Sequence, residues 1–192
     1  MERPGVMEAR IRTARLILRA WRETDRAPFA EMSADPEVMA HLGGPIDRAA
    51  SDAIAERLGA EQAINGHCFW AVERLDDARF LGFCGLRIGG HAGTPVVGEL
   101  EIGWRLARDA WGQGYAREAA EAALDWGWRN TAAPQIAAWT VPANAPSWGL
   151  MLRIGMVHRP ELDFDHPRFA PGHPLCRHVV YTAARPQQET VP

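Results

Sequence analysis

Two glutamates with the spacing of a strand are candidates for acid–base chemistry. Glu99 and Glu101 are two residues apart, so on a strand both lie on one face, opposite Leu100 and Ile102. A carboxylate that lies beside another carboxylate in a partly dry cleft has its pKa raised, which suits a general base. The alternative is that both are solvated strand residues, and the spacing alone leaves both interpretations open.

A glycine-rich segment follows, with the sequence WGQGYA at residues 111–116. Gly112 and Gly114 allow a tight turn and let a ligand approach the backbone. If a helix begins after them, its first N–H groups have no partner inside the helix and its dipole adds positive charge. That arrangement favours a phosphate or pyrophosphate. A tight turn from a strand to a helix needs glycine in any case, so a simple turn is the alternative.

The residues around this turn predict a strand before it and a helix after it. Apolar residues at positions 100, 102, 104 and 106 alternate with Glu99, Glu101, Gly103 and Arg105, which is typical of a strand. Small residues at positions 116, 120, 123 and 127 form a stripe that lets a helix lie close to a sheet. The charged residues are expected mostly on the opposite side, facing water: Arg117, Glu118, Glu121, Asp125 and Arg129.

The segment resembles the acetyl-CoA-binding motif of the GNAT superfamily of N-acetyltransferases, Arg/Gln-x-x-Gly-x-Gly/Ala. Trp111, Gly114 and Ala116 take its first, fourth and sixth positions. Trp111 departs from that pattern, but Trp-Gly-x-Gly-Tyr-Ala is usual in the branch resembling ribosomal-protein-alanine N-acetyltransferases. Two further segments resemble this branch: TARLILR at residues 13–19, and VPANAPS at residues 141–147 followed by RIGM at residues 153–156. Together the three segments extend over most of the chain.

The resemblance implies a binding site for acetyl-CoA. Asn144 matches an asparagine that hydrogen-bonds the pantetheine arm, Arg153 replaces a common lysine near a CoA phosphate, and the backbone N–H near Leu106 is the implied oxyanion donor. A turn residue and an exposed helix arginine are the alternatives for Asn144 and Arg153. The residues implied in cofactor binding are Trp104, Arg105, Leu106, Trp111, Gly112, Gln113, Gly114, Tyr115, Ala116, Asn144, Ser147 and Arg153.

Acetyl transfer from a thioester to an amine needs a neutral amine, stabilisation of an oxyanion and a proton for the departing thiolate. Similar enzymes often carry a glutamate on this strand, which favours Glu101 as the catalytic base, although many relatives use only ordered water. Ser147 matches the family's serine and is the predicted proton donor to the thiolate. The alternative is a first-turn helix serine beside Pro146.

Other reactive residue types are better explained without chemistry. Four residues of one proline-containing loop suggest a metal site, but their spacing matches no zinc or calcium pattern, so no metal is predicted. These residues are Asp163, Asp165, His166 and His173. The cysteines are odd in number and lack metal-ligand spacing, which predicts reduced, small hydrophobic residues. They are Cys68, Cys84 and Cys176.

Length and composition predict one globular domain over residues 1–192, with loose ends at residues 1–9 and 185–192. The net charge of −3 argues against a nucleic-acid partner, which normally requires a basic protein. No apolar run is long enough to span a bilayer, and residues 1–12 carry no apolar signal segment. These features predict a cytoplasmic protein without a membrane partner.

The patterns predict a mixed α/β fold. Strands are expected at residues 10–21, 67–74, 79–88, 99–106, 135–141, 156–159 and 176–183. Helices are expected from residue 24 or 25 to 33, and at 36–42, 47–64, 116–129 and 146–154. The resemblance implies a GNAT-like fold, in which helices flank a single mixed, mostly antiparallel sheet. In that fold the strands of Glu101 and Trp139 splay apart to admit the pantetheine arm.

The leading hypothesis is an acetyl-CoA-dependent N-acetyltransferase that acts on a primary amine, either a protein or peptide N-terminus or a small amine. Direct attack in a ternary complex is favoured because no cysteine or serine has a recognisable activating triad. The resemblance places Trp21, Arg22 and Phe29 near the acceptor. The alternatives are a non-catalytic acyl-CoA-binding module, an antibiotic-modifying acetyltransferase, or a Rossmann domain, whose glycine loop would follow the first strand. A tryptophan-rich surface is compatible with a homodimer.

Overall fold

The structure, a computed structural model, describes residues 11–187 and contains two compact units. Within the described residues, the first unit combines the chain up to Arg87 with Ile102–Ala123. The second unit combines Ile88–Glu101 with the chain from Leu124 onward. Each unit is therefore built from two separate stretches of sequence. No helix of the described chain is long and apolar enough to cross a membrane.

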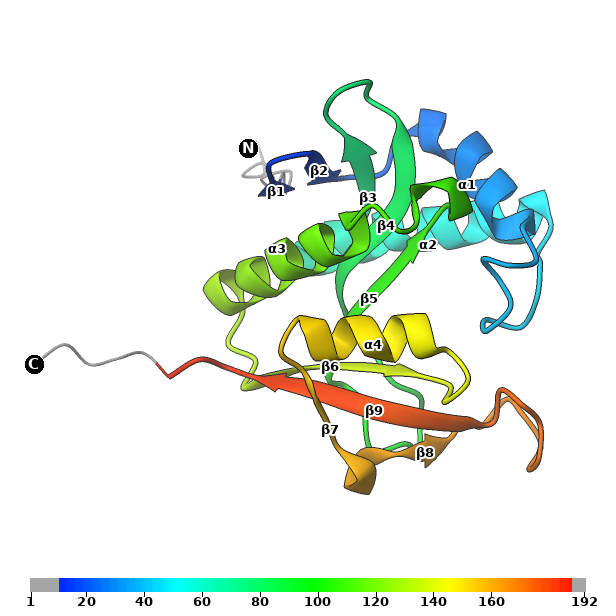
Figure 1. The fold of residues 1–192 in the computed structure, drawn as a ribbon, viewed down its shortest axis with the longest axis vertical. Coiled ribbons are helices and arrows are strands. Elements are labelled where there is room, and N and C mark those ends of the chain that lie inside the picture. Colours follow the sequence, from blue (N-terminus) through cyan, green and yellow to red (C-terminus); the bar gives the residue numbers. More distant parts are fainter. Residues whose placement is uncertain (1–10, 188–192) are drawn as a thin grey trace, which may run out of the picture. The chain divides into compact units, whose positions relative to one another are not determined.

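The described chain contains both strands and helices, labelled in Figure 1. The strands are β1 (Ile11–Arg12), β2 (Leu16–Arg19), β3 (Phe69–Arg74), β4 (Phe80–Ile88), β5 (Leu100–Leu106), β6 (Gln135–Thr140), β7 (Val157–His158), β8 (Phe164–Asp165) and β9 (Arg177–Ala184). The α-helices are α1 (Arg26–Ala34), α2 (Arg48–Asn65), α3 (Tyr115–Asn130) and α4 (Ala145–Arg153). Three short 3-10 helices are η1 (Glu23–Asp25), η2 (Arg108–Ala110) and η3 (Pro160–Leu162).

The strands are hydrogen-bonded in the order β1-β2-β3-β4-β5-β6-β9-β7, and β8 pairs with β9. β5 and β6 run parallel with the register Glu101 to Ala137, whereas β2–β3, β3–β4 and β6–β9 are antiparallel. This confirms the predicted mixed α/β fold with a mostly antiparallel sheet. The splay between β5 and β6 stays a prediction, because beyond Glu101 the two strands belong to different units.

Two elements near the N-terminus differ from the sequence-based prediction. The predicted first strand is a hairpin, because the hydroxyl oxygen of Thr13 accepts a hydrogen bond from Leu16 N–H at 2.9 Å and turns the chain between β1 and β2. The predicted helix at residues 36–42 is a series of turns. So short a segment gains few helical bonds, and Gly43 and Gly44, with φ angles of 99° and 89°, direct the chain away.

The prediction for α2 was correct at both ends. The Asp47 carboxylate accepts a hydrogen bond from Ala50 N–H at 2.8 Å and caps the helix. Gly66, with φ of 75°, ends it. The buried face includes Ser51, Ala55 and Leu58.

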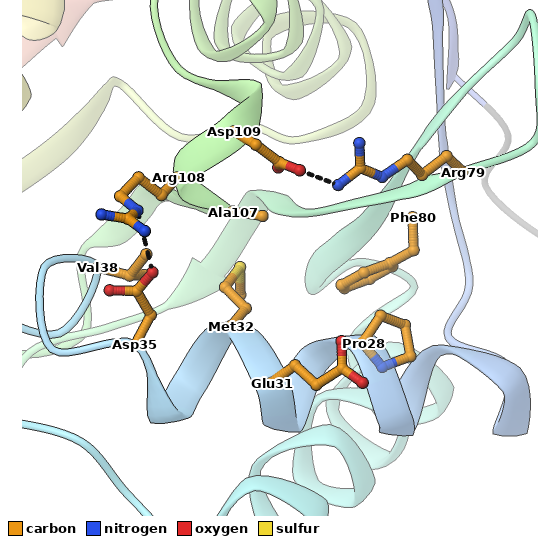
Figure 2. Close-up of a pocket in the computed structure, with 10 residues that line it drawn as sticks. All are labelled: Pro28, Glu31, Met32, Asp35, Val38, Arg79, Phe80, Ala107, Arg108 and Asp109. Carbon is orange, nitrogen blue, oxygen red and sulfur yellow. Dashed lines mark hydrogen bonds and ion pairs between the residues drawn. The ribbon is translucent and has the colours of Figure 1, made fainter.

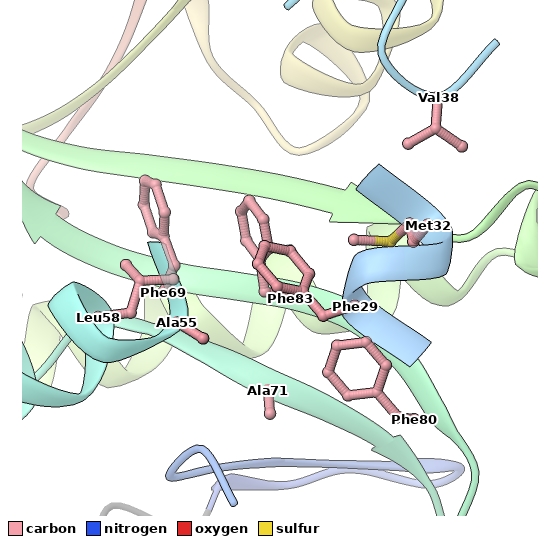
Figure 3. Close-up of a cluster of buried hydrophobic side chains, with 9 residues drawn as sticks. All are labelled: Phe29, Met32, Val38, Ala55, Leu58, Phe69, Ala71, Phe80 and Phe83. Carbon is pink, nitrogen blue, oxygen red and sulfur yellow. The ribbon is translucent and has the colours of Figure 1, made fainter. Parts of the chain in front are cut away.

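The first unit has an aromatic core formed by α1, α2, β3 and β4 (Figure 3). Phe69 and Phe83 stack with ring centroids 5.4 Å apart, and Phe29 meets Phe83 edge-on at 6.1 Å. Trp21 packs against this core and donates its indole N–H to the Phe69 carbonyl at 2.8 Å. Trp70 is fully buried.

A buried ion-pair network lies beside this core. The Arg19 guanidinium donates two hydrogen bonds to the Asp25 carboxylate, at 2.7 and 2.8 Å, and its Nε donates to Glu73 at 2.7 Å. Burial alone acts against the charge of Arg19, but these carboxylates outweigh it and raise the pKa of Arg19. The network connects β2, η1 and β3.

The second unit is built on the antiparallel β6–β9 pair, with α4 beside β6 (Figure 1). Its small core contains Val96, Phe164 and Val180, with Trp139 and Leu162 packed against it. Arg185, which the sequence assigned to a loose tail, is held at the end of β9. Its side chain donates hydrogen bonds to the carbonyls of Trp128, Thr131 and Ala133 at 2.6 to 3.0 Å.

Candidate active site

The glycine turn of the first unit has the geometry of an anion-binding loop. Gly112 and Gly114 adopt φ angles of 72° and 80°, and α3 begins directly after them at Tyr115. The first helical bond runs from Glu118 N–H to the Gly114 carbonyl at 3.1 Å, so the N–H groups of residues 115–117 have no partner within the helix. A Cβ at Gly112 would meet no atom within 4 Å, which shows that the turn is open to a ligand.

Trp111 attaches this turn to the end of β5. Its indole N–H donates to the Leu106 carbonyl at 2.8 Å, and its ring is about half exposed. The side chain of Gln113 donates to the Asp109 carbonyl at 2.8 Å. Both side chains therefore position the turn from within the first unit. Their predicted contact with a cofactor stays a prediction.

Glu118 and the β1–β2 turn form a brace under the glycine turn. Oε1 of Glu118 accepts hydrogen bonds from the Thr13 hydroxyl at 2.6 Å and from Arg15 N–H at 2.8 Å. Arg15 Nε donates to Oε2 at 2.7 Å, and Arg15 Nη1 donates to the Gln113 carbonyl at 3.0 Å. The prediction that Glu118 faces water was wrong, because the hairpin covers it. We call Thr13, Arg15 and Glu118 the loop brace.

The brace also sets the charge state of Glu118 and the place of Tyr115. Burial acts to raise the pKa of Glu118, but the hydrogen bonds from Thr13 and Arg15 outweigh it and lower the pKa. The Arg15 guanidinium lies over the ring of Tyr115, 4.6 Å from its centroid, and Tyr115 is buried. Tyr115 therefore offers a ligand its backbone rather than its hydroxyl.

In the second unit, the Glu101 side chain lies against Gly89 and close to Trp139. A Cβ placed on Gly89 would fall 2.3 Å from Oε2 of Glu101 and 2.7 Å from the Trp139 ring. No side chain fits there, so glycine makes room for both groups. Trp139 in turn meets Phe164 edge-on at 6.3 Å. Glu99 is engaged separately, since it accepts a hydrogen bond from Gln135 at 3.2 Å.

The predicted residues of α4 are also placed within the second unit. Asn144 precedes the helix and donates through Nδ2 to the Thr140 hydroxyl at 2.9 Å. Ser147 is in the first turn, partly buried, and its hydroxyl makes no hydrogen bond to any described residue. Arg153 is an exposed arginine in the last turn. Ser147 is thus a first-turn serine, as the alternative to its catalytic role describes, although it does not cap the helix. Its role as a proton donor stays a prediction.

A pocket of about 460 Å³ opens beside α1 in the first unit (Figure 2). Met32, Val38 and Phe80 give it an apolar wall, and Arg79 and Arg108 stand at its rim. Arg79 pairs with Asp109, and Arg108 pairs with Asp35 at 3.4 Å. No sequence pattern predicts this pocket, because three separate segments of the chain form it.

The loop suspected of metal binding has a structural role. The Asp163 carboxylate accepts hydrogen bonds from Val180 N–H at 2.9 Å and from the His158 ring at 3.1 Å. Among residues 11–187, no group of histidine, cysteine, aspartate and glutamate side chains is arranged to hold a metal ion. The three cysteines are free and buried, as the sequence predicts.

Sequence reasoning missed several residues that position the candidate site. Gly89 could not be recognised, because its role depends on Glu101 and Trp139, which approach it only in the folded chain. Thr13 and Arg15 belong to a recognised segment, but nothing in their spacing shows that they reach Glu118. The one sequence feature that pointed to this contact is Glu118, a carboxylate in the first turn of a helix that follows a glycine turn.

An open glycine turn at the start of a helix suits the binding of a phosphate-containing ligand. The sequence matches the family described as acetyltransferase (GNAT) domain over residues 15–157. The chain therefore belongs to the GNAT family and is an N-acetyltransferase, which transfers an acetyl group to an amine. The family's acetyl donor is acetyl-CoA.

Similar proteins agree with this assignment. YkkB of Bacillus subtilis is 32% identical over 145 residues, which cover 75% of this chain and 83% of that protein. The N-acetyltransferase YnaD of the same organism is 28% identical over 148 residues, covering 76% and 81%. The crystal structure of an acetyltransferase from Agrobacterium tumefaciens superposes with a TM-score of 0.75 at 27% identity, covering 95% of this chain and 98% of that one.

A more distant structure shares the fold. It is the spermidine N-acetyltransferase of Vibrio cholerae, solved in complex with CoA and spermine, with a TM-score of 0.69 at 17% identity. The comparison covers 90% of this chain and 97% of that chain. At this identity the similarity concerns the fold alone.

Proposed function

We propose that this N-acetyltransferase transfers the acetyl group of acetyl-CoA directly to a primary amine, either a peptide N-terminus or a small amine. The observation that carries the proposal is the open turn at Gly112 and Gly114, which is followed at once by α3 and held by the loop brace. Free N–H groups and the positive end of a helix dipole suit the pyrophosphate of CoA.

Cofactor binding in this proposal depends mainly on backbone groups. The N–H groups of residues 114–116 bind the pyrophosphate, and Trp111 and Gln113 fix the turn through their bonds to Leu106 and Asp109. The end of β5 offers backbone groups to the pantetheine amides. The sequence resemblance implies further cofactor contacts by the side chains of Asn144, Ser147 and Arg153, which lie in the second unit.

The chemistry needs two proton transfers. Glu101 accepts a proton from the attacking amine, directly or through water, so that a neutral nitrogen attacks the thioester carbonyl. The backbone N–H near Leu106 donates to the carbonyl oxygen as negative charge develops on it. Ser147 gives a proton to the departing thiolate, and its unengaged hydroxyl supports this role.

The cysteines support direct transfer over an acetylated enzyme. Burial raises the pKa of the Cys68 and Cys84 thiols well above the usual range, and Cys176 is buried too. A nucleophilic thiolate is therefore disfavoured at Cys68 and Cys84. Incubation with radiolabelled acetyl-CoA in the absence of an amine is expected to leave the protein unlabelled. Stoichiometric labelling during turnover would contradict direct transfer.

The first experiment is calorimetric titration with acetyl-CoA, CoA and ATP. We expect micromolar binding of acetyl-CoA and CoA and none of ATP. Thiol release is then measured with a panel of primary amines, for the wild type and for Glu101→Gln. The variant is expected to bind acetyl-CoA but to turn over about 100-fold more slowly. Absence of acetyl-CoA binding would refute the proposed function.

A further inference from the structure

Arg105 on β5 is a partly buried cation without an acidic partner. Its Nε is shielded from solvent and has no hydrogen-bond partner, and Nη1 makes only a long contact of 3.5 Å to the Ser33 hydroxyl. Within residues 11–187 no carboxylate lies within 4 Å of its guanidinium. Because a guanidinium carries five N–H donors, most of its hydrogen-bonding capacity is unused.

Another arginine of the same unit, Arg19, has a structural role and can be compared with Arg105. Arg19, on β2, is buried and is paired with both Asp25 and Glu73. Arg105 has no such compensation, and burial lowers its pKa to about 10. An unpaired buried charge is unfavourable for folding, so a stability role does not explain Arg105.

The surroundings of Arg105 suit a planar anion. The guanidinium carbon lies 5.2 Å from the centroid of Phe83 and 5.9 Å from that of Phe29. These rings hold the guanidinium plane by cation–π contact but leave its edge donors unsatisfied. A carboxylate matches two parallel N–H donors in geometry and charge.

The anion belongs to the acceptor rather than to CoA. The phosphates of CoA are expected at the glycine turn, whereas Arg105 packs on Phe29 of α1, which the sequence resemblance places near the acceptor. Strand alternation places the side chains of Arg105 and Leu106 on opposite faces of β5.

We propose that Arg105 binds a carboxylate of the acceptor, so that the substrates are amino acids or short peptides with a free carboxyl group. This inference depends on the proposed function, because it names the acceptor class of the same reaction. A neutral amine or a polyamine would leave the guanidinium unpaired and is therefore a poorer substrate.

The test compares each common α-amino acid, and a set of dipeptides, with the corresponding C-terminal amide. Thiol release from acetyl-CoA is followed for the wild type, Arg105→Met and Arg108→Met. Arg108 is the matched control because it is an exposed arginine three residues away that pairs with Asp35 and Glu37. In the wild type, the kcat/KM of preferred acids is expected to exceed that of their amides about 10- to 100-fold. Arg105→Met brings this ratio close to one, and Arg108→Met preserves it.

Several outcomes contradict the proposal. Amides used as well as acids by the wild type, or an acid-to-amide ratio unchanged in Arg105→Met, would overturn it. Acetyl-CoA binding without turnover of any acid would also refute the acceptor carboxylate, whereas absence of acetyl-CoA binding would refute the proposed function itself. If Arg105→Met does not fold, Arg105→Lys replaces it. That variant keeps the charge but loses the paired donors, so an intermediate ratio is expected.

Discussion

Arg15 and Glu118 are 103 residues apart in the sequence, and Arg15 donates both its backbone N–H and its side-chain Nε to the two oxygens of the Glu118 carboxylate, at 2.8 and 2.7 Å. The same arginine holds the Gln113 carbonyl at 3.0 Å. The β1–β2 hairpin thereby fixes the residue between the two glycines of the turn. Residues far from any reacting atom thus determine the shape of the proposed pyrophosphate site.

Replacing Glu118 is expected to loosen the glycine turn. Glu118→Gln keeps the size of the side chain but loses the ion pair with Arg15, so the affinity for acetyl-CoA should fall about tenfold, with a loss of about 1–3 kcal/mol in unfolding free energy. Calorimetry and urea unfolding measure the two effects. Glu121→Gln is the control, since Glu121 forms only an exposed pair with Arg117 on the same helix. Equal behaviour of the two variants would contradict the role of the brace.

Gly89 is expected to be essential for the position of Glu101. Gly89→Ala places a methyl group where Oε2 of Glu101 and the Trp139 ring now lie, so both must move. We expect kcat to fall about 100-fold. Gly59→Ala is the matched control, because its added Cβ meets no atom within 4 Å and α2 gains about 0.5–1 kcal/mol of stability. A fully active Gly89→Ala enzyme would show that Glu101 does not act from this position.

A catalytic role of Ser147 can be distinguished by experiment from a structural role. Its hydroxyl makes no hydrogen bond to the described residues, so Ser147→Ala should unfold at the wild-type temperature while kcat falls about 10- to 100-fold. Asp47→Ala gives the opposite result, because this residue caps α2 and its loss destabilises the protein by about 1 kcal/mol. Thermal unfolding and thiol release are measured on both variants. Wild-type turnover by Ser147→Ala would exclude Ser147 as the proton donor.

His166 should make stability depend on pH. Burial, together with the nearby His91, His178 and Arg168, lowers its pKa from 6.5 to about 4. The unfolded chain therefore binds this proton at a higher pH than the folded chain does. Its contribution to stability is complete above pH 6.5 and is lost as the pH falls from 6.5 to about 4.

His166→Asn removes this titrating group and keeps an acceptor for Arg168 N–H, which now donates to Nδ1 of His166. Urea unfolding at a series of pH values between 7 and 4 should show a steeper decline for the wild type than for the variant. His41→Asn, which removes a histidine elsewhere, should follow the wild type. Parallel curves for the wild type and His166→Asn would contradict this prediction.

The parts that the sequence predicts are those set by local patterns. The alternation of apolar residues predicts β5, and the two glycines, which adopt positive φ angles in the structure, predict the turn. Asp47 and Gly66 mark the two ends of α2. The family motif then identified the acetyl donor. Local patterns did not predict the contacts that a side chain makes with a segment far away in the sequence. Glu118 looks like a solvent-facing helix residue until the hairpin covers it.

Arg105 and Arg19 illustrate the same limit. Each is a charged residue on an alternating strand, and nothing in the sequence shows that one meets two carboxylates while the other meets none. Pairing depends on η1 and β3 for Arg19, and on α1 and β4 for Arg105. The distinction between a structural and a ligand-binding arginine therefore appears only in the structure.

The division of the first unit into two stretches affects how the protein is made. Ribosomes release the chain from its N-terminus, so Arg15 emerges long before Glu118 exists. The hairpin has no carboxylate to bind until α3 has been synthesised. The first unit therefore cannot complete its fold until then. A fragment that ends at Arg87 lacks Glu118 of the loop brace and all of the glycine turn, so it cannot be excised as a working module.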